Sequence, residues 1–444
     1  MYFISLKIRY FSLFVSALFL CFAINADSKN LGEILAQVEQ HTPALKAARA
    51  RTEVWKAAKQ QAKSRYFGEI DALVRNNNYD SGRLINPITY PVNLQPKLFD
   101  DNQIGYGLNA RLPVDINGRI TAGVDSAGKQ LDAARAQEND VGLQLLHDTA
   151  HLYHSLAGVK ALESALQKQI DALTGHIKVA AVSIEAGRTA RVEKLRLIAD
   201  KEAVKGKLAM LIGQEQELRA KIAALMGTKS FFDIVIPIND PPEKTDERVD
   251  GTMNRPDIQT VKSRIEAADA DIRGAVASRF PELNIDGSWI RNQGFNGEGD
   301  NTWTLSVQLL LPLWDGSGRR SAVAQAQAAR NINRHQLAAL QNQARAELVA
   351  AKADWHAAEI SYRATIASVR AARETARIQT DRFAEGRLSA ADLVDAEAAL
   401  SGARSSRALA LTHWWQAEDR LRHAIGLAPY AYQKKNNKIK NNDS

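Results

Sequence analysis

Two long stretches of this chain, residues 114–236 and 313–428, contain no proline. Proline and glycine mark most turns, and a β-sandwich or a compact α/β enzyme needs turns far more often than this. Of the 444 residues, 45% are hydrophobic and 24% are charged, which excludes wholesale disorder and a collagen-like chain. The sequence therefore predicts a mostly helical protein with very long helices.

The first 26 residues have the pattern of a secretory signal peptide. Lys7 and Arg9 precede an uncharged stretch at 11–24, and Ala26 offers a small residue at the expected cleavage site. The alternative, an N-terminal membrane anchor, is weaker because about 14 apolar residues are too few to span a bilayer. We expect the mature chain to be exported.

Cys21 is the only cysteine of the chain. A lipoprotein would be cleaved before Cys21 and acylated there, but the bulky Leu20 fits that pattern poorly. Cleavage after Ala26 removes the thiol, which excludes disulfides and thiol catalysis from the mature protein. No cofactor is expected.

The chain repeats itself. Two segments, about 30–227 and 250–427, each read as helix, strand, strand, long helix and long helix, with a linker at 228–249 between them. We expect one domain at 27–428 and a basic, disordered tail at 429–444. The landmarks that recur at the same offset of 199 positions are Pro113 and Pro312, Gly187 and Gly386, and Gly227 and Gly426.

Apolar and polar residues alternate in two segments, 103–114 and 303–311, with weaker runs at 66–75 and 283–290 before them. Such alternation predicts strands with one apolar face. An amphipathic sheet packed on a core is the commoner fate of such strands. The export signal and the lack of any obvious covering layer favour contact with lipid.

Four strands cannot close a barrel, and an open edge in lipid leaves backbone groups without hydrogen bonds. Bacterial barrels have even strand numbers of about 8 or more, so three chains that contribute twelve strands are the natural solution. We expect a homotrimer on this ground.

The helical segment at 118–185 would be roughly 100 Å long, which exceeds the thickness of any bilayer and places it in an aqueous compartment. A solid coiled-coil rod is the alternative, but a rod explains neither the strands nor the repetition. The returning segment carries apolar residues at coiled-coil spacing, namely Leu208, Leu211, Leu218, Ile222 and Leu225.

Together these features resemble the TolC-like outer-membrane efflux proteins over residues 30–428. The most specific stretches are NRPDIQTVKSRIEAADADI at 254–272, LSVQLLLPLWDGSGRR at 305–320 and RFAEGRLSAADLVDAEAAL at 382–400. The resemblance implies a trimer with a twelve-stranded barrel in the outer membrane of a Gram-negative-type bacterium. It further implies an α-helical barrel in the periplasm and docking to an inner-membrane transporter through a periplasmic adaptor.

The resemblance also assigns roles to turn residues. Pro113 and Pro312 mark the transitions from strand to long helix. The hairpin tips, at the periplasmic mouth where adaptors of the family engage, are formed by Gly187, Arg188, Gly386 and Arg387. A plain turn is the simpler interpretation of both glycines.

Asp392 and Asp395 lie three residues apart and share a helix face. In a trimer they would form two stacked rings of carboxylates, and the resemblance places such rings at a constriction that filters ions by charge. Glu193 is the equivalent of Asp392 in the first repeat. The alternative is an exposed acidic pair that is favoured by the dipole of a helix N-terminus.

His147, His151 and His154 follow one another at helical spacing, and this spacing could hold a metal. The segment HDTAH lacks the glutamate of a zinc-protease helix, so we favour a polar stripe and expect no metal site.

The sequence predicts a passive exit duct for small molecules, metals or polypeptides, which serves a tripartite efflux pump or a type I secretion system. The alternative is a periplasmic coiled-coil adaptor or scaffold. A hydrolase has no support because the chain lacks a G-x-S-x-G elbow, an HExxH pair and a Walker loop. Nucleic-acid binding is not expected of an exported chain.

Overall fold

The computed structural model describes residues 28–79, 100–228, 233–234, 241–242, 255–297 and 299–432. The predicted signal peptide with Cys21, most of the predicted linker, and the end of the basic tail from 433 onward lie outside these residues. The described chain divides into two compact units. Unit 1 comprises the described residues within 1–45, 142–251 and 346–444, and unit 2 comprises those within 46–141 and 252–345.

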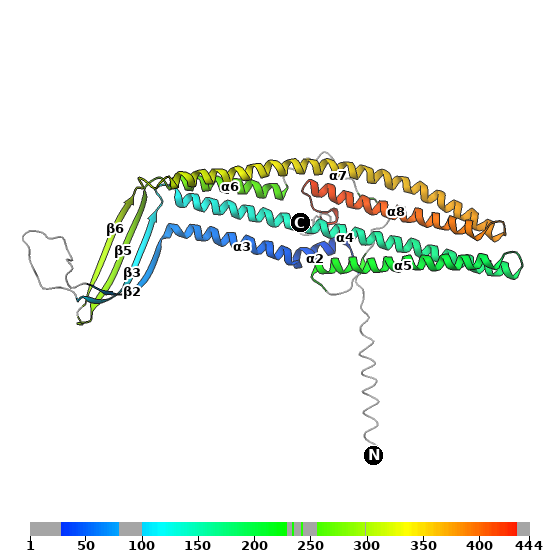
Figure 1. Cartoon of the computed structure of the whole chain (residues 1–444), viewed down its shortest axis with the longest axis horizontal. Helices are drawn as coiled ribbons and strands as arrows, with labels where there is room; N and C mark the ends of the chain where they lie inside the picture. The colour runs from blue at the N-terminus through cyan, green and yellow to red at the C-terminus, as the bar shows by residue number, and fades with distance from the viewer. Residues whose placement is uncertain are drawn as a thin grey trace, which may run out of the picture. The chain divides into compact units, whose positions relative to one another are not determined.

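The predicted long helices are confirmed (Figure 1). α4 (Arg119–Glu185) and α7 (Gly318–Ala384) have 67 residues each, which corresponds to about 100 Å. Each contributes its first part to unit 2 and the rest to unit 1. Among the residues that the structure describes, none of the helices combines the length and the apolar character needed to cross a bilayer.

Unit 2 contains one antiparallel sheet of four strands in the order β2-β3-β5-β6 (Figure 1). The strands are β2 (Glu69–Asn78), β3 (Asn102–Val114), β5 (Glu282–Gly294) and β6 (Gly299–Leu310). The first strand begins later than predicted, because residues 65–67 form a 3-10 turn and Gly68 adopts a φ of 69°. The same unit holds α6 (Pro256–Ala277) and most of α3 (Pro43–Ser64).

The apolar faces of the strands are open. On β3, apolar side chains point outward while Gln103 is buried, and every residue of β6 is exposed. Within the described residues, β2 and β6 each pair with only one other strand. The exposed large apolar residues of β3 and β6 are Ile104, Tyr106, Leu108 and Leu112 on β3 and Trp303, Leu305, Val307, Leu309 and Leu310 on β6.

Both long helices begin after an aspartate that accepts backbone hydrogen bonds. Asp115 accepts from the N–H groups of Ile120 and Thr121, at 2.9 and 2.8 Å, and Asp315 accepts from the N–H of Arg319 at 2.8 Å. Such carboxylates satisfy the free donors of a helix N-terminus. Pro113 is the last residue but one of β3, and Pro312 follows β6.

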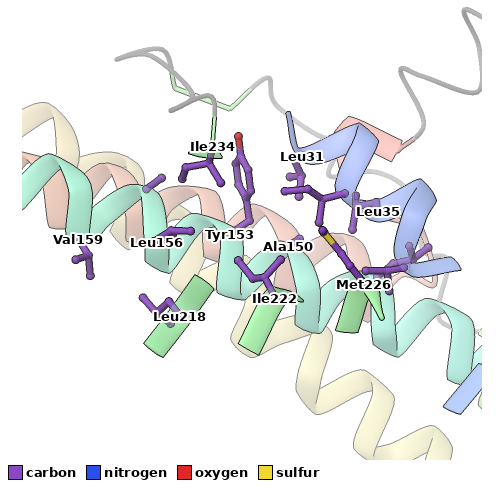
Figure 2. Close-up of a cluster of buried hydrophobic side chains, with 14 residues drawn as sticks. Leu31, Leu35, Ala150, Tyr153, Leu156, Val159, Leu218, Ile222, Met226 and Ile234 are labelled. Carbon is purple, nitrogen blue, oxygen red and sulfur yellow. The ribbon is translucent and has the colours of Figure 1, made fainter. Parts of the chain in front are cut away.

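Unit 1 is a set of packed helices with three apolar cores. It contains α2 (Leu31–His41), α5 (Arg191–Met226), α8 (Ala390–Ala424) and the later parts of α4 and α7. In the first core, α2, α4 and α5 meet around Leu35, Leu156 and Ile222, none of which has any exposed surface (Figure 2). The predicted seam on α5 is thereby confirmed for Leu218 and Ile222.

A short parallel pair of strands, β1 (Ser28–Lys29) and β4 (Asp233–Ile234), joins this core. In the third core α7 packs against α8, where the Trp355 indole N–H donates to Glu418 Oε2 at 2.7 Å. Glu418 is fully buried, so this bond and the nearby Arg422 compensate for the loss of its hydration.

Candidate functional site

The two helical hairpins reverse at Gly187 and Gly386, as predicted. Their φ angles are 70° and 73°, in the left-handed region that glycine adopts without strain. In both turns the next residue donates its N–H five residues back: Arg188 to Ser183 O and Arg387 to Arg382 O, each at 2.9 Å. These are Schellman turns, which satisfy the free carbonyl groups at a helix C-terminus.

The arginines at the two tips are exposed, and they differ in their partners. Arg387 forms an ion pair with Glu385 at 3.1 Å. The Arg188 side chain has no hydrogen bond or ion pair within the described part of the chain. An exposed, unpaired guanidinium remains available to a partner protein.

The outgoing helices begin differently. The Ser389 hydroxyl oxygen accepts the N–H of Asp392 at 3.2 Å, and the hydroxyl donates to the Asp392 carboxylate at 2.7 Å. Ala190, at the same place before α5, has only a methyl group, which cannot accept a hydrogen bond to cap that helix. The outgoing helix of the second hairpin, α8, therefore begins with a side-chain cap, and the outgoing helix of the first hairpin, α5, does not.

Glu193 joins the two hairpins. Its Oε2 accepts the backbone N–H of Ala390, the first residue of α8, at 2.7 Å. A carboxylate at a helix N-terminus is stabilised by the hydrogen bond and by the helix dipole. The half-buried Glu193 of α5 thus faces the start of α8, which the sequence did not indicate.

An apolar core lies next to this contact. Phe383 and Leu393, from α7 and α8, are 5% and 0% exposed. Apolar packing therefore holds the two hairpins together beside this contact. The buried members are Ile170, Leu173, Ala180, Leu197, Val204, Phe383, Ala390 and Leu393.

A buried polar pair connects α4 and α8 beside that core. His176 Nε2 lies 3.1 Å from Glu397 Oε1, and both side chains are 9% exposed. The ring of Phe383 meets His176 edge-on, with 6.4 Å between centroids. His176 and Glu397 are 221 positions apart, and no local pattern links them.

Asp392 and Asp395 are both exposed on α8. The Asp392 carboxylate accepts a hydrogen bond from Ser389, whereas the Asp395 side chain has no hydrogen bond or ion pair among the described residues. Both carboxylates therefore face solvent, where they can attract cations.

The three histidines do not converge. His147 Nε2 lies 2.8 Å from the carbonyl oxygen of Leu427, and His154 Nε2 lies 3.1 Å from Asp419 Oδ2. His151 is exposed. The described residues include no group of three or more His, Cys, Asp or Glu side chains able to hold a metal.

A comparison with known families identifies the chain. The family described as outer membrane efflux protein matches residues 34–228 and 252–427. The chain belongs to this family. Its members are outer-membrane efflux channels and not enzymes, and the mostly α-helical fold with a β part is that of TolC-like channels.

Individual proteins agree with this assignment. Nodulation protein T of Rhizobium leguminosarum bv. trifolii is 25% identical over 68% of this chain and 67% of that protein. The solvent efflux pump outer membrane protein SrpC of Pseudomonas putida is 22% identical over 52% of this chain and 51% of its own length. The structure of the outer membrane protein VceC from Vibrio cholerae superposes with a TM-score of 0.74 at 20% identity, over 90% of this chain and 96% of VceC, and shows the shared fold.

The contact between Glu193 and α8 leads to a first prediction. In Glu193→Ala the N–H of Ala390 loses its acceptor, so amide hydrogen exchange at the start of α8 should rise roughly fivefold. Exchange mass spectrometry of peptides covering 386–396 measures this. Glu202→Ala removes an exposed carboxylate of the same helix that pairs with Lys205, and it should leave these peptides unchanged. Equal exchange in both variants would show that the contact contributes nothing.

His147 gives a second prediction. A carbonyl only accepts, so Nε2 carries the proton and donates to Leu427, and Nδ1 is buried without a partner among the described residues. Burial lowers the pKa of His147 from 6.5 to about 4, because a second proton would sit on Nδ1 without an acceptor.

Unfolding restores the ordinary pKa, so between pH 6.5 and about 4 the unfolded chain binds a proton that the folded chain does not. Stability should fall by on the order of 2–3 kcal/mol as the pH drops through this window. His147→Gln retains a donor but does not titrate, so it should lessen the fall in thermal denaturation temperature measured by circular dichroism. His413→Gln, at a side chain that is 51% exposed, serves as the control. An equal pH dependence in wild type and His147→Gln would contradict the assignment.

Proposed function

We propose that this chain is the outer-membrane exit duct of a tripartite efflux pump or a type I secretion system. The sheet of unit 2 carries the proposal, because its apolar side chains are exposed and its outer strands β2 and β6 are each paired on one side only. In lipid, backbone donors and acceptors at such edges must be paired within protein. Three chains with four strands each would satisfy both edges and give a twelve-stranded barrel.

The helices of unit 1 support a duct that extends from the membrane into the periplasm. The length of α4 and α7 suits a tunnel in the periplasm that continues the barrel. SrpC is, by its name, the outer membrane protein of a solvent efflux pump. We extend that role to this chain, with a periplasmic adaptor and an inner-membrane transporter as its partners.

The adaptor would engage the hairpin tips. Gly187 and Gly386 form the reversals, and Arg188 and Arg387 project from them as exposed cations. The charge of these tips suits an adaptor surface with carboxylates. The duct itself performs no reaction, so the transporter must supply the energy.

A third prediction tests the duct against the adaptor or scaffold alternative. Expressed in a Gram-negative bacterium, the chain should stay in the outer-membrane fraction after an alkaline wash, cross-link as a trimer, and form pores in planar bilayers. An integral barrel resists the wash because moving its apolar outer surface from lipid into water is unfavourable. Release into the soluble fraction with no pore activity would support the adaptor or scaffold.

We further propose that Asp392 and Asp395 form the charged constriction. In a trimer the exposed pair would give two stacked rings of three carboxylates, which attract cations and bind divalent ions. Glu193 points to the N-terminus of α8, at 2.7 Å from the Ala390 nitrogen. We therefore assign Glu193 to holding α8 in place, and Asp392 and Asp395 to the charge filter.

The fourth prediction concerns this filter. The double variant Asp392→Ala/Asp395→Ala should raise single-channel conductance in planar bilayers and weaken block by divalent cations several-fold, because the carboxylates that bind the ions are gone. Glu202→Ala, an exposed carboxylate on α5, is the matched control. Unchanged divalent block in the double variant would reject the constriction.

A further inference from the structure

A pocket in unit 1 is lined by basic side chains that the proposed duct does not require. It lies among α4, α7 and α8 and has a volume of about 540 Å³, which is the size of many small-molecule sites. Gly158 of α4 and Thr412 of α8 lie so close that a Cβ on the glycine would come within 2.5 Å of the Thr412 hydroxyl. The pocket therefore sits where two helices are held in tight register.

The charged side chains around this pocket are all basic. None of the described residues that line it is acidic, whereas five are cationic: Lys160, Lys168, Arg373, Arg404 and Arg407. Lys160 is neutralised by Asp233 and Glu215.

The other four cations have no carboxylate partner within the described part of the chain. Arg404 and Arg407 are half-buried, and Arg407 lies 6.0 Å from the centre of the Tyr362 ring. Glu374, the acidic neighbour of Arg373, is engaged by Arg377 at 2.8 Å. Unpaired guanidinium groups in a partly desolvated pocket attract an anion more strongly than in open water.

Apolar side chains make up most of the remaining lining, beside His154, Ser164, Thr412 and Trp415. The Trp415 ring stacks on His154 with 5.3 Å between centroids, and its buried indole Nε1–H has no acceptor among the described residues. Buried donors normally have a partner, so this one marks a place for an acceptor. The apolar residues of the lining are Ala157, Ala161, Ala165, Val369, Ala408 and Leu411.

We propose that this pocket is a binding site for an amphiphilic organic anion, a molecule with an aromatic or alicyclic body and a sulfonate or carboxylate group. The acidic group pairs with Arg404 and Arg407, which present planar donor pairs to it. The body packs on the alanines and Leu411. The site goes beyond the export role, and it is tested by binding to the purified chain, so its failure would leave the duct proposal untouched.

The fifth prediction uses 1-naphthalenesulfonate as the probe and 1-naphthylmethylammonium as its counterpart of opposite charge. Calorimetric titration of the full chain in detergent, corrected by a protein-free blank, should give saturable binding of the sulfonate only. Arg404→Gln/Arg407→Gln should weaken binding at least about tenfold, since charged hydrogen bonds are lost. The single variant Arg373→Gln, on the exposed rim, should weaken it less while leaving the packed helices intact.

Arg370→Gln is the matched control, because Arg370 is an exposed arginine one turn before Arg373 on α7 and does not line the pocket. It should bind the probe like the wild type. Unchanged binding in both the double variant and Arg373→Gln would overturn the site, and so would equal binding of the cation. If sulfate bound as tightly as 1-naphthalenesulfonate, the pocket would be a simple anion site and not a site for an amphiphilic anion. If hexaglutamate bound more tightly than the probe, the ligand would be an acidic peptide instead.

Discussion

Lateral packing of the long helices is the constraint on which the rest of unit 1 depends. A helix of 67 residues, such as α4 or α7, gains most of its stability from the helices packed against it. Each of the three apolar cores supplies this contact at a different level: α2 with α4 and α5, α7 with α8, and both hairpins together near their tips. The tips are therefore positioned by the packing of the helices that lead to them.

The sheet of unit 2 is stabilised in the opposite way. Its apolar side chains remain outside, and Ile290 is the one large apolar side chain of the four described strands that counts as buried. The backbone hydrogen bonds between strands are satisfied internally except at the outer edges of β2 and β6. Such a sheet is incomplete in water, and membership in a family of outer-membrane channels gives this surface a physical role.

Polar contacts among the helices add to the apolar packing of unit 1. Glu193 and the pair of His176 and Glu397 bind the second hairpin to the first, on either side of an apolar core. The exposed Asp392 and Asp395 lie on the helix that these contacts position. The same helix, α8, brings Arg404 and Arg407 to the cationic pocket.

Much of the architecture follows from local sequence. The absence of proline over two long stretches requires long helices, the alternation at 103–114 and 303–311 requires strands, and Gly187 and Gly386 place the reversals. Each of these signals acts within a few residues of chain. The start of the first strand was mispredicted because Gly68 permits a turn that the loose alternation at 66–75 conceals.

The side-chain partners of the candidate site required the folded chain. The helical spacing of His147 and His154 allowed a metal site, but packing turned one ring to Leu427 and the other to Asp419. Glu193 resembled Asp392 by position in the repeat, yet it reaches the N-terminus of α8. The sequence determined which segments are helices, strands and turns, because those preferences are local. Only the tertiary structure decided which polar groups meet, because such pairs in the candidate site lie up to 280 positions apart and are selected by the register in which the helices pack.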